Sequence, residues 1–261
     1  MRFEMLGPLR VLDHERVSRL TAHKIEIVLA VLLARGAQVT TTDELMSELW
    51  GEHPPRRATA SLHVYISQLR KFLARPGQEG SPIVTRPPGY LFQFDGHELD
   101  VFDFEMCAEH ARSALRAERL EEAAEAFELA LGLWRGATLG DLRDGPIISA
   151  HATWLEELRL ECRELLVDAY LRLGRHRDVI GRLYSLSEEH PLHEAFYRQL
   201  MVALYRSERQ ADALKVYRTA HDRLEQELAL APCRSLRRLH MAILRGDDEP
   251  LFAERLDLMT A

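Results

Sequence analysis

Along the first part of the chain, hydrophobic positions change from a two-residue period to a helical one. Phe3 and Met5, and then Leu9 and Val11, alternate with other residues on either side of Gly7-Pro8. Alternation of this kind, interrupted by turn-forming residues, is typical of short strands. Residues 1–20 are therefore predicted to form strands joined by tight turns.

Two helices are predicted next. The first carries apolar residues at a 3.6-residue period, namely Ile25, Val28, Leu29, Leu32 and Leu33. It stops at Gly36, a residue suited to a helix C-terminus. Thr41 and Glu44 form a capping-box pattern at the start of the second helix, which ends at Trp50-Gly51.

The segment 54–73 is predicted to contain a third helix with one apolar and one outward polar face. The apolar face consists of Ala58, Leu62, Ile66, Leu69 and Leu73. The outward face is a stripe of mostly polar or small residues: Arg57, Ser61, Val64, Ser67, Gln68 and Lys71. A helix face of this kind can enter a groove of DNA.

A hairpin is predicted over residues 83–92, where two short β-prone runs flank Arg86-Pro87-Pro88-Gly89. Proline fixes φ and glycine permits a positive φ, so this sequence favours a tight turn with Arg86 at its tip. Any single arginine here is better explained as a solvated surface charge, and Trp50 and Tyr65 are equally consistent with core aromatics. The ordered combination of helix and hairpin nevertheless favours a DNA reader.

Local charge supports that interpretation. Residues 53–90 contain six Lys or Arg residues and one Glu, a net charge of +5 within a chain of net charge -7. Residues 1–97 hold 12 basic and 10 acidic side chains, and the remaining residues hold 22 and 31, a net charge of -9. A basic island in an acidic chain is a typical phosphate-binding surface, and the two halves are predicted to bind different partners.

Strands, three helices and a hairpin in this order resemble the winged helix-turn-helix domain of OmpR-type response regulators. The resemblance is carried by Glu44-Leu45, Leu49-Trp50-Gly51, Leu69-Arg70-Lys71 and Gly89-Tyr90. It implies that Arg86 enters the minor groove and that Val64 and Gln68 face bases. It also implies that phosphates are held by Trp50, Ser61, Tyr65, Arg70 and Tyr90. Ser67 and Gln68 stand where such regulators often carry arginines, so their base preference does not transfer.

After residue 97 the pattern becomes that of an all-α region. Amphipathic helices are predicted at 103–117, 119–134, 147–173, 175–189, 192–207, 209–228 and 232–245. Residues 169–178 match 203–212 at an offset of 34, and 115–123 match 205–213. This period is typical of tetratricopeptide-type helix pairs, which form concave protein-binding surfaces.

Together the two halves resemble the Streptomyces antibiotic regulatory protein family, and more narrowly its small, stand-alone members. The resemblance extends from the first strand to about Gly246 and includes Thr85-Arg86-Pro87-Pro88-Gly89-Tyr90-Leu91, Leu131-Gly132-Leu133-Trp134-Arg135-Gly136 and Gln210-Ala211-Asp212-Ala213-Leu214. The expected fold is an α+β winged helix followed by an all-α tetratricopeptide-like domain. Residues 1–97 are predicted to bind DNA, residues 98–246 to form a bacterial transcriptional activation domain, and residues 247–261 to be a disordered tail.

The family resemblance implies a transcriptional activator of antibiotic biosynthesis genes. Its expected partners are double-stranded promoter DNA with direct repeats, RNA polymerase holoenzyme, and a second protomer side by side on the DNA. No apolar run approaches the roughly 20 residues that span a bilayer, and no signal peptide is evident, so we predict a cytoplasmic, nucleoid-associated protein without a membrane partner.

The sequence offers little to an enzyme or a metalloprotein. No catalytic residue, metal site or cofactor is predicted, because phosphate-binding and nucleophile motifs are missing. His190 and His193 lack a metal-binding spacing, and a loop is the better interpretation of that segment. Cys107, Cys162 and Cys233 are expected to be reduced core residues.

The sequence leaves two alternative functions open. One is a repeat scaffold that binds a protein or a signal ligand and uses the winged helix for protein contacts. The other, with much less support, is a hydrolase using His190 or His193. Sequence-specific DNA binding would distinguish the activator from both.

Overall fold

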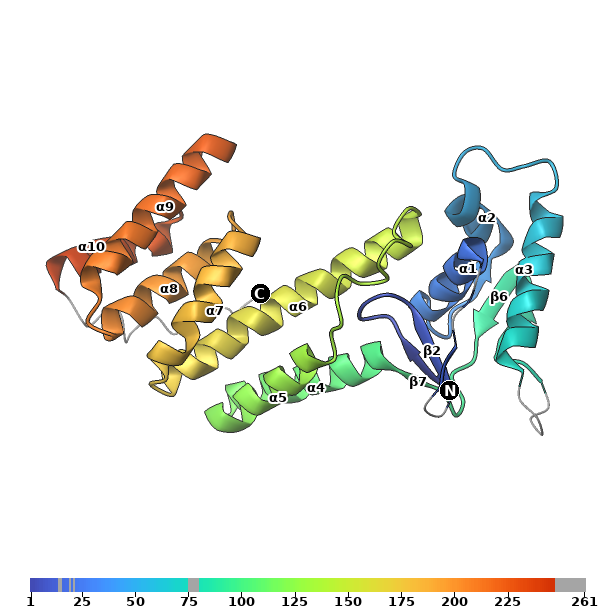
Figure 1. Cartoon of the computed structure of the whole chain (residues 1–261), viewed down its shortest axis with the longest axis horizontal. Helices are drawn as coiled ribbons and strands as arrows, with labels where there is room; N and C mark the ends of the chain where they lie inside the picture. The colour runs from blue at the N-terminus through green and yellow to red at the C-terminus, as the bar shows by residue number, and fades with distance from the viewer. Residues whose placement is uncertain (14–15, 19, 21, 75–79, 247–261) are drawn as a thin grey trace. The chain divides into compact units, whose positions relative to one another are not determined.

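The computed structural model describes residues 1–246, apart from 14–15, 19, 21 and 75–79 (Figure 1). The predicted tail, residues 247–261, lies outside the described residues. The fold class is the predicted one, an α+β winged helix followed by an all-α region.

The amino-terminal strands form a sheet that extends beyond the predicted winged helix. β1 (Arg2–Glu4), β2 (Arg10–Asp13) and β3 (Arg16–Ser18) are antiparallel neighbours, which confirms the strands predicted within residues 1–20. β7 (Glu98–Leu99) pairs in parallel with β1, giving the order β3-β2-β1-β7. Residues 98–99, expected to belong to the helical half, thus complete the first sheet.

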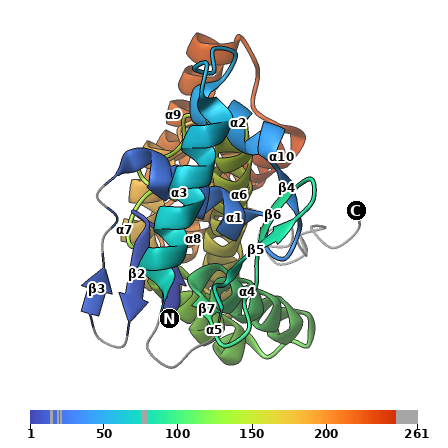
Figure 2. The same ribbon diagram turned by 90° about the vertical axis from the view of Figure 1, so that its right-hand side faces the viewer.

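The winged helix follows the predicted order of elements. It consists of α1 (His23–Ala34), β4 (Thr40–Thr41), α2 (Thr42–Trp50), α3 (Ala58–Leu73), β5 (Ile83–Arg86) and β6 (Gly89–Phe92) (Figure 2). The capping box is present, with the Glu44 amide 3.2 Å from Thr41 Oγ1 and the Thr41 amide 2.8 Å from Glu44 Oε2. The predicted inward residues of α3 are all buried.

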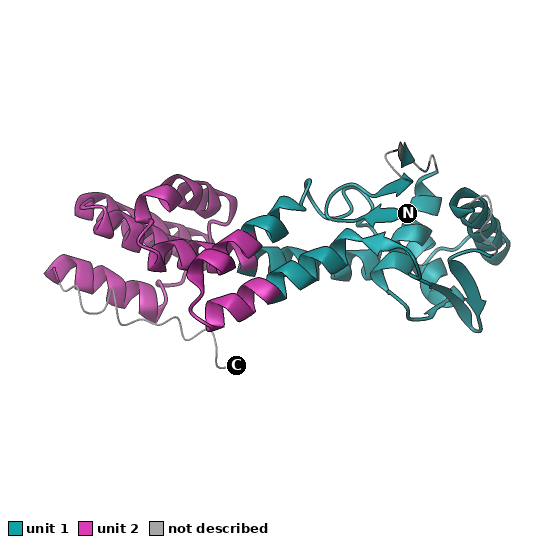
Figure 3. Ribbon diagram, turned by 90° about the horizontal axis from the view of Figure 1, so that it is seen from below, with its two compact units in different colours: residues 1–109, 128–161 teal, residues 110–127, 162–261 magenta. Residues whose placement is uncertain are grey.

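Seven helices are described after β7, as predicted. They are α4 (Asp100–Arg116), α5 (Leu120–Gly132), α6 (Pro146–Arg172), α7 (His176–Glu189), α8 (Glu194–Arg206), α9 (Gln210–Leu228) and α10 (Arg234–Arg245). α4 begins three residues earlier than expected, because β7 leads directly into Asp100, which is buried. The chain divides into two compact units, one of residues 1–109 and 128–161 and one of residues 110–127 and 162 onward (Figure 3).

The sequence repeat has a structural counterpart at three helix ends. Glu118, Gly174 and Glu208 occupy matching repeat positions, and all have a left-handed backbone with φ of 59°, 77° and 62°. At each, the following amide donates back to the carbonyl five residues earlier, as in Arg209 to Leu204 at 2.9 Å. A glycine suits this position, yet two of the three carry glutamate.

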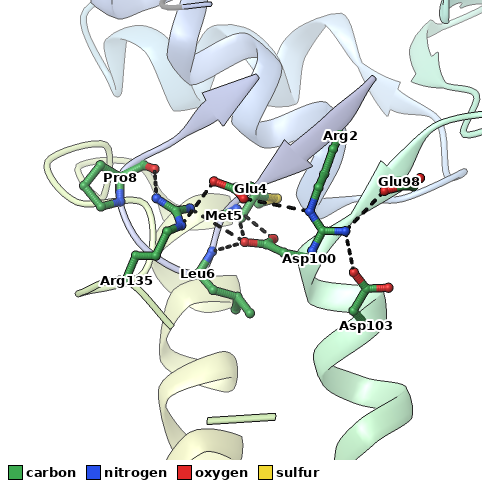
Figure 4. A network of polar contacts seen from close by, with 9 residues as sticks. All are labelled: Arg2, Glu4, Met5, Leu6, Pro8, Glu98, Asp100, Asp103 and Arg135. Atoms are coloured by element: carbon green, nitrogen blue, oxygen red, sulfur yellow. Dashed lines mark hydrogen bonds and ion pairs between the residues drawn. The ribbon is translucent and has the colours of Figure 1, made fainter. Parts of the chain in front are cut away.

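A buried carboxylate ties the first strand to the helical region. Asp100, which is 2% exposed, accepts hydrogen bonds from the Met5 amide at 2.8 Å and the Leu6 amide at 3.0 Å (Figure 4). Arg135 forms ion pairs with Asp100 at 3.7 Å and with Glu4 at 3.2 Å. Burial raises the pKa of Asp100 to about 6, although the two amides and Arg135 act to lower it.

A second buried carboxylate joins α2 to α6. Glu48 accepts hydrogen bonds from the Ile147 amide at 2.8 Å and from the Ile148 amide at 2.9 Å, in the first turn of α6. Those amides have no partner within the helix, and its dipole favours an anion there. A Cβ atom on Gly145 would lie 2.2 Å from the Glu48 carboxyl carbon, so glycine is needed at that close approach.

We predict that Glu208→Gly stabilises the chain by about 1 kcal/mol, because glycine adopts a left-handed backbone without the cost that a Cβ atom adds. Urea unfolding would measure the change. As a control, Arg218→Gly in the middle of α9 should destabilise by about 1 kcal/mol. Equal destabilisation by both substitutions would contradict the assigned turn.

The pKa of Asp100 predicts a pH dependence of stability. Because it is raised to about 6 from an ordinary 3.8, the folded chain binds this proton more tightly than the unfolded chain. The stabilisation is full below pH 4 and is lost as pH rises through 6. The stability of the wild type relative to Asp100→Asn should therefore be about 1 kcal/mol greater at pH 5 than at pH 8. A pH-independent difference in urea unfolding would contradict this account.

Candidate nucleic-acid interface

The outward face of α3 presents most of the predicted recognition residues to solvent. Arg57, Ser67, Gln68 and Lys71 are exposed, and Ser61 is half-buried. Val64 is 51% exposed although it is aliphatic. A small apolar group among polar ones can contact a thymine methyl group while its neighbours hydrogen-bond to base edges.

Unpaired cations flank this face. In the described part of the chain, no acidic residue forms an ion pair with Arg57, Lys71 or Arg86. Arg57 lies at the start of α3, Lys71 in its last turn, and Arg86 on the separate β5–β6 hairpin. Cations without protein partners remain available to phosphates.

Trp50 and Tyr65 lie together where α2 meets α3. Their rings are stacked with centroids 6.3 Å apart, and both side chains are half-buried. Lys24 of α1 extends over the Trp50 ring at 4.6 Å and donates a hydrogen bond to the Leu49 carbonyl at 3.2 Å. The sequence does not predict this role of Lys24, because no local pattern connects α1 with the end of α2.

Arg70 joins the recognition helix to the hairpin. Its Nε donates to the Ile83 carbonyl at 3.0 Å, and its guanidinium donates to Thr85 Oγ1 at 2.8 Å. The guanidinium carbon lies 5.9 Å from the centre of the Tyr90 ring, and Tyr90 is only 7% exposed. Both residues were expected at phosphates, and the structure places them where α3 contacts the hairpin.

The hairpin depends on Gly89 for a reason that differs from the expected one. Arg86 pairs with Gly89 across the turn, but Gly89 does not have a positive φ. A Cβ atom there would lie 1.9 Å from the Thr40 carbonyl oxygen of the neighbouring strand β4. Glycine is required because β6 lies close against β4. Arg86, at the tip of the hairpin, is exposed.

The histidines and cysteines considered in the sequence lie apart from this surface in the chain. The described residues contain no group of His, Cys, Asp and Glu side chains that could hold a metal ion. His193 contacts Glu164 at 3.2 Å and the Phe196 ring at 4.5 Å, next to the turn between α7 and α8. The expectation of three core cysteines is wrong for Cys233, which is exposed, whereas Cys162 is buried. None of the helices that the structure describes is long and apolar enough to span a membrane.

Comparisons with known proteins match a different family to each of the two halves of the chain. Residues 15–92 match the family described as transcriptional regulatory protein, C terminal, and residues 99–244 match the bacterial transcriptional activator domain. The regulatory protein DnrI of Streptomyces peucetius is 36% identical over 95% of this chain and 93% of its own length. The regulatory protein AfsR of Streptomyces griseus is also 36% identical, but the chain spans only 25% of its length.

A solved structure extends the similarity to the fold. The structure of Mycobacterium tuberculosis EmbR in complex with a low-affinity phosphopeptide matches 94% of this chain with a TM-score of 0.88 and 34% identity. This chain covers 65% of that EmbR chain. The phosphopeptide belongs to the EmbR complex.

We predict that Arg70→Ala loosens the hairpin against α3. Hydrogen exchange at the amides of residues 83–86 should become faster, because two hydrogen bonds to this strand are removed. Lys71→Ala, which removes a neighbouring exposed cation, should leave that exchange unchanged. Identical exchange in both variants would show that Arg70 does not hold the hairpin.

Proposed function

Because the chain belongs to the Streptomyces antibiotic regulatory protein family of transcriptional activators, we propose that it binds promoter DNA through its winged helix and recruits RNA polymerase holoenzyme. The observation that carries the proposal is the exposed face of α3, with Arg86 on a separate hairpin. Arg57 and Lys71 flank this face and form no ion pair with any residue that the structure describes. Relatives in this family are transcription regulators and not enzymes.

Different residues supply affinity and sequence preference. Arg57 and Lys71 contact phosphates, release counterions and so make binding strongly dependent on salt. Val64 and Gln68, on the middle of the exposed face, contact base edges in the major groove. Arg86 enters the minor groove, where narrow A·T-rich stretches concentrate negative potential. Arg70 and Tyr90 act mainly by fixing the hairpin relative to α3.

Residues 98–246 supply the contact with polymerase. Stacked helix pairs bind proteins on extended surfaces, and a surface held beside a promoter raises the local concentration of polymerase without a chemical step. The DNA sites are direct repeats upstream of promoters, those of antibiotic biosynthesis genes among them, and two protomers bind them side by side.

Selection from a random pool of duplex DNA tests the proposal. The purified chain should enrich one motif. Val64→Ala and Gln68→Ala should each change the preferred bases by about 1 to 3 kcal/mol of discrimination, whereas Lys71→Ala should weaken binding to all sequences. Gln93→Ala, an exposed glutamine after β6, is the matched control and should change neither. Failure to enrich any motif would refute sequence-specific binding and favour the scaffold alternative.

We predict that the spacing between repeats controls cooperative binding. Two protomers that meet on one face of the duplex require repeat centres about 10 to 10.5 base pairs apart, or a multiple of that distance. Insertion of about half a turn should abolish cooperativity and leave the affinity for each single repeat unchanged. Equal cooperativity before and after the insertion, in quantitative footprinting, would contradict contact between protomers.

A further inference from the structure

The outward face of α10 carries cations and apolar groups. Arg234, Arg237, Arg238 and Arg245 are all exposed, and α10 contains no acidic residue. Met241 and Leu244 are 46% and 51% exposed between these arginines. The opposite face fixes the helix, because Leu236, Leu239, Ala242 and Ile243 are buried against the preceding helices.

The arginines of α10 differ from several other arginines of the same compact unit. Some of those arginines pair with carboxylates, as in Arg119 with Glu122 at 2.7 Å and Arg223 with Glu188 at 2.7 Å. Within the residues that the structure describes, no acidic group forms an ion pair with any of the four arginines of α10. In a chain with 41 acidic and 34 basic residues, an unpaired cationic face fits an anionic partner.

The exposed face of α5 has the complementary chemistry. Glu121 and Glu125 lie one turn apart, and both are exposed. Neither has an ion pair among the described residues, and α5 contains no basic residue. Leu129, one turn further along the same helix, is 69% exposed. Two charges followed by an apolar residue at helical spacing thus occur on both helices, with opposite charge: Glu121, Glu125 and Leu129 on α5, and Arg234, Arg238 and Met241 on α10.

We propose that the exposed face of α10 in one copy binds the exposed face of α5 in a second copy of this chain. The apolar groups favour a protein over DNA, because phosphates offer nothing to Met241 or Leu244. The charged groups of the two faces form no ion pair among residues 1–246 that the structure describes, so they are available to a second copy. The partner expected for α10 is therefore a helix with acidic and apolar residues on one face, and α5 of a second copy has such a face.

The proposed contact is asymmetric, because two different surfaces meet. Such a heterologous contact repeats head to tail and leaves one α5 face and one α10 face free at the ends. A heterologous contact allows copies to share one orientation, as the halves of a direct repeat do, whereas a two-fold contact would suit inverted repeats. The arrangement of copies on DNA rests on the proposed function. The contact between copies does not, because it can be measured without DNA.

Charge reversal tests the contact. One variant carries Glu121→Lys and Glu125→Lys, and the other carries Arg234→Glu and Arg238→Glu. Self-association is followed without DNA at low salt, by fluorescence anisotropy of a labelled trace titrated with unlabelled full-length chain. The titration extends to about 1 mM, the effective concentration that neighbouring sites on one DNA molecule supply. Circular dichroism and thermal unfolding verify that these surface changes leave the fold intact.

Each variant alone should associate at least about tenfold more weakly than the wild type, because attraction becomes repulsion at two charged positions. Mixing the two variants should restore wild-type association, since the new lysines face the new glutamates. A chain with all four substitutions should also associate like the wild type. A monomeric wild type over the whole range, or a mixture no stronger than either variant alone, would overturn the inference. Binding of both variants to DNA with a single site should be unchanged, so loss of DNA binding would count against the proposed function and not against this contact.

Discussion

The buried carboxylate of Asp100 is the constraint on which the first compact unit depends. A carboxylate out of water is tolerated only where donors surround it, and Asp100 has the amides of Met5 and Leu6 as well as Arg135. Arg135 in turn pairs with Glu4, while its backbone amide donates to the Leu6 carbonyl at 2.7 Å. The first strand, the start of α4 and the segment after α5 are thereby fixed together. Glu48 adds a second connection, from α2 to the first turn of α6.

This constraint bears on how an activator of this family can work. The region that matches the bacterial transcriptional activator domain begins at residue 99, yet residues 100–109 of α4 and 146–161 of α6 belong to the same compact unit as the winged helix. In the proposed mechanism, a winged helix seated on DNA therefore carries part of the activating region with it in a fixed orientation. A surface that is already held in one orientation loses less conformational entropy when polymerase binds than a surface on a flexible tether would.

The sequence predicted features that depend on local spacing. The inward face of α3, the capping box at Thr41 and the seven later helices each have a signal within a few residues. The left-handed turns at Gly174 and Glu208 fall at matching positions of the 34-residue repeat, but the sequence did not predict them. Contacts between distant residues have no such signal. Glu48 and Ile148 are 100 positions apart, and Asp100 is 95 positions from Met5. The same limit explains why the outward residues of α3 could be predicted, whereas the contacts of Arg70 with β5 and of Lys24 with Trp50 could not.

In the proposed function, α3 and the β5–β6 hairpin are the surface that DNA covers. Hydrogen exchange of the full chain, measured with and without the duplex DNA that it selects, tests this most directly. DNA should slow exchange in residues 58–73 and 83–92, and a scrambled duplex at the same salt concentration should have a much smaller effect. Protection confined to the helices after residue 110, with no change in α3 or the hairpin, would contradict it.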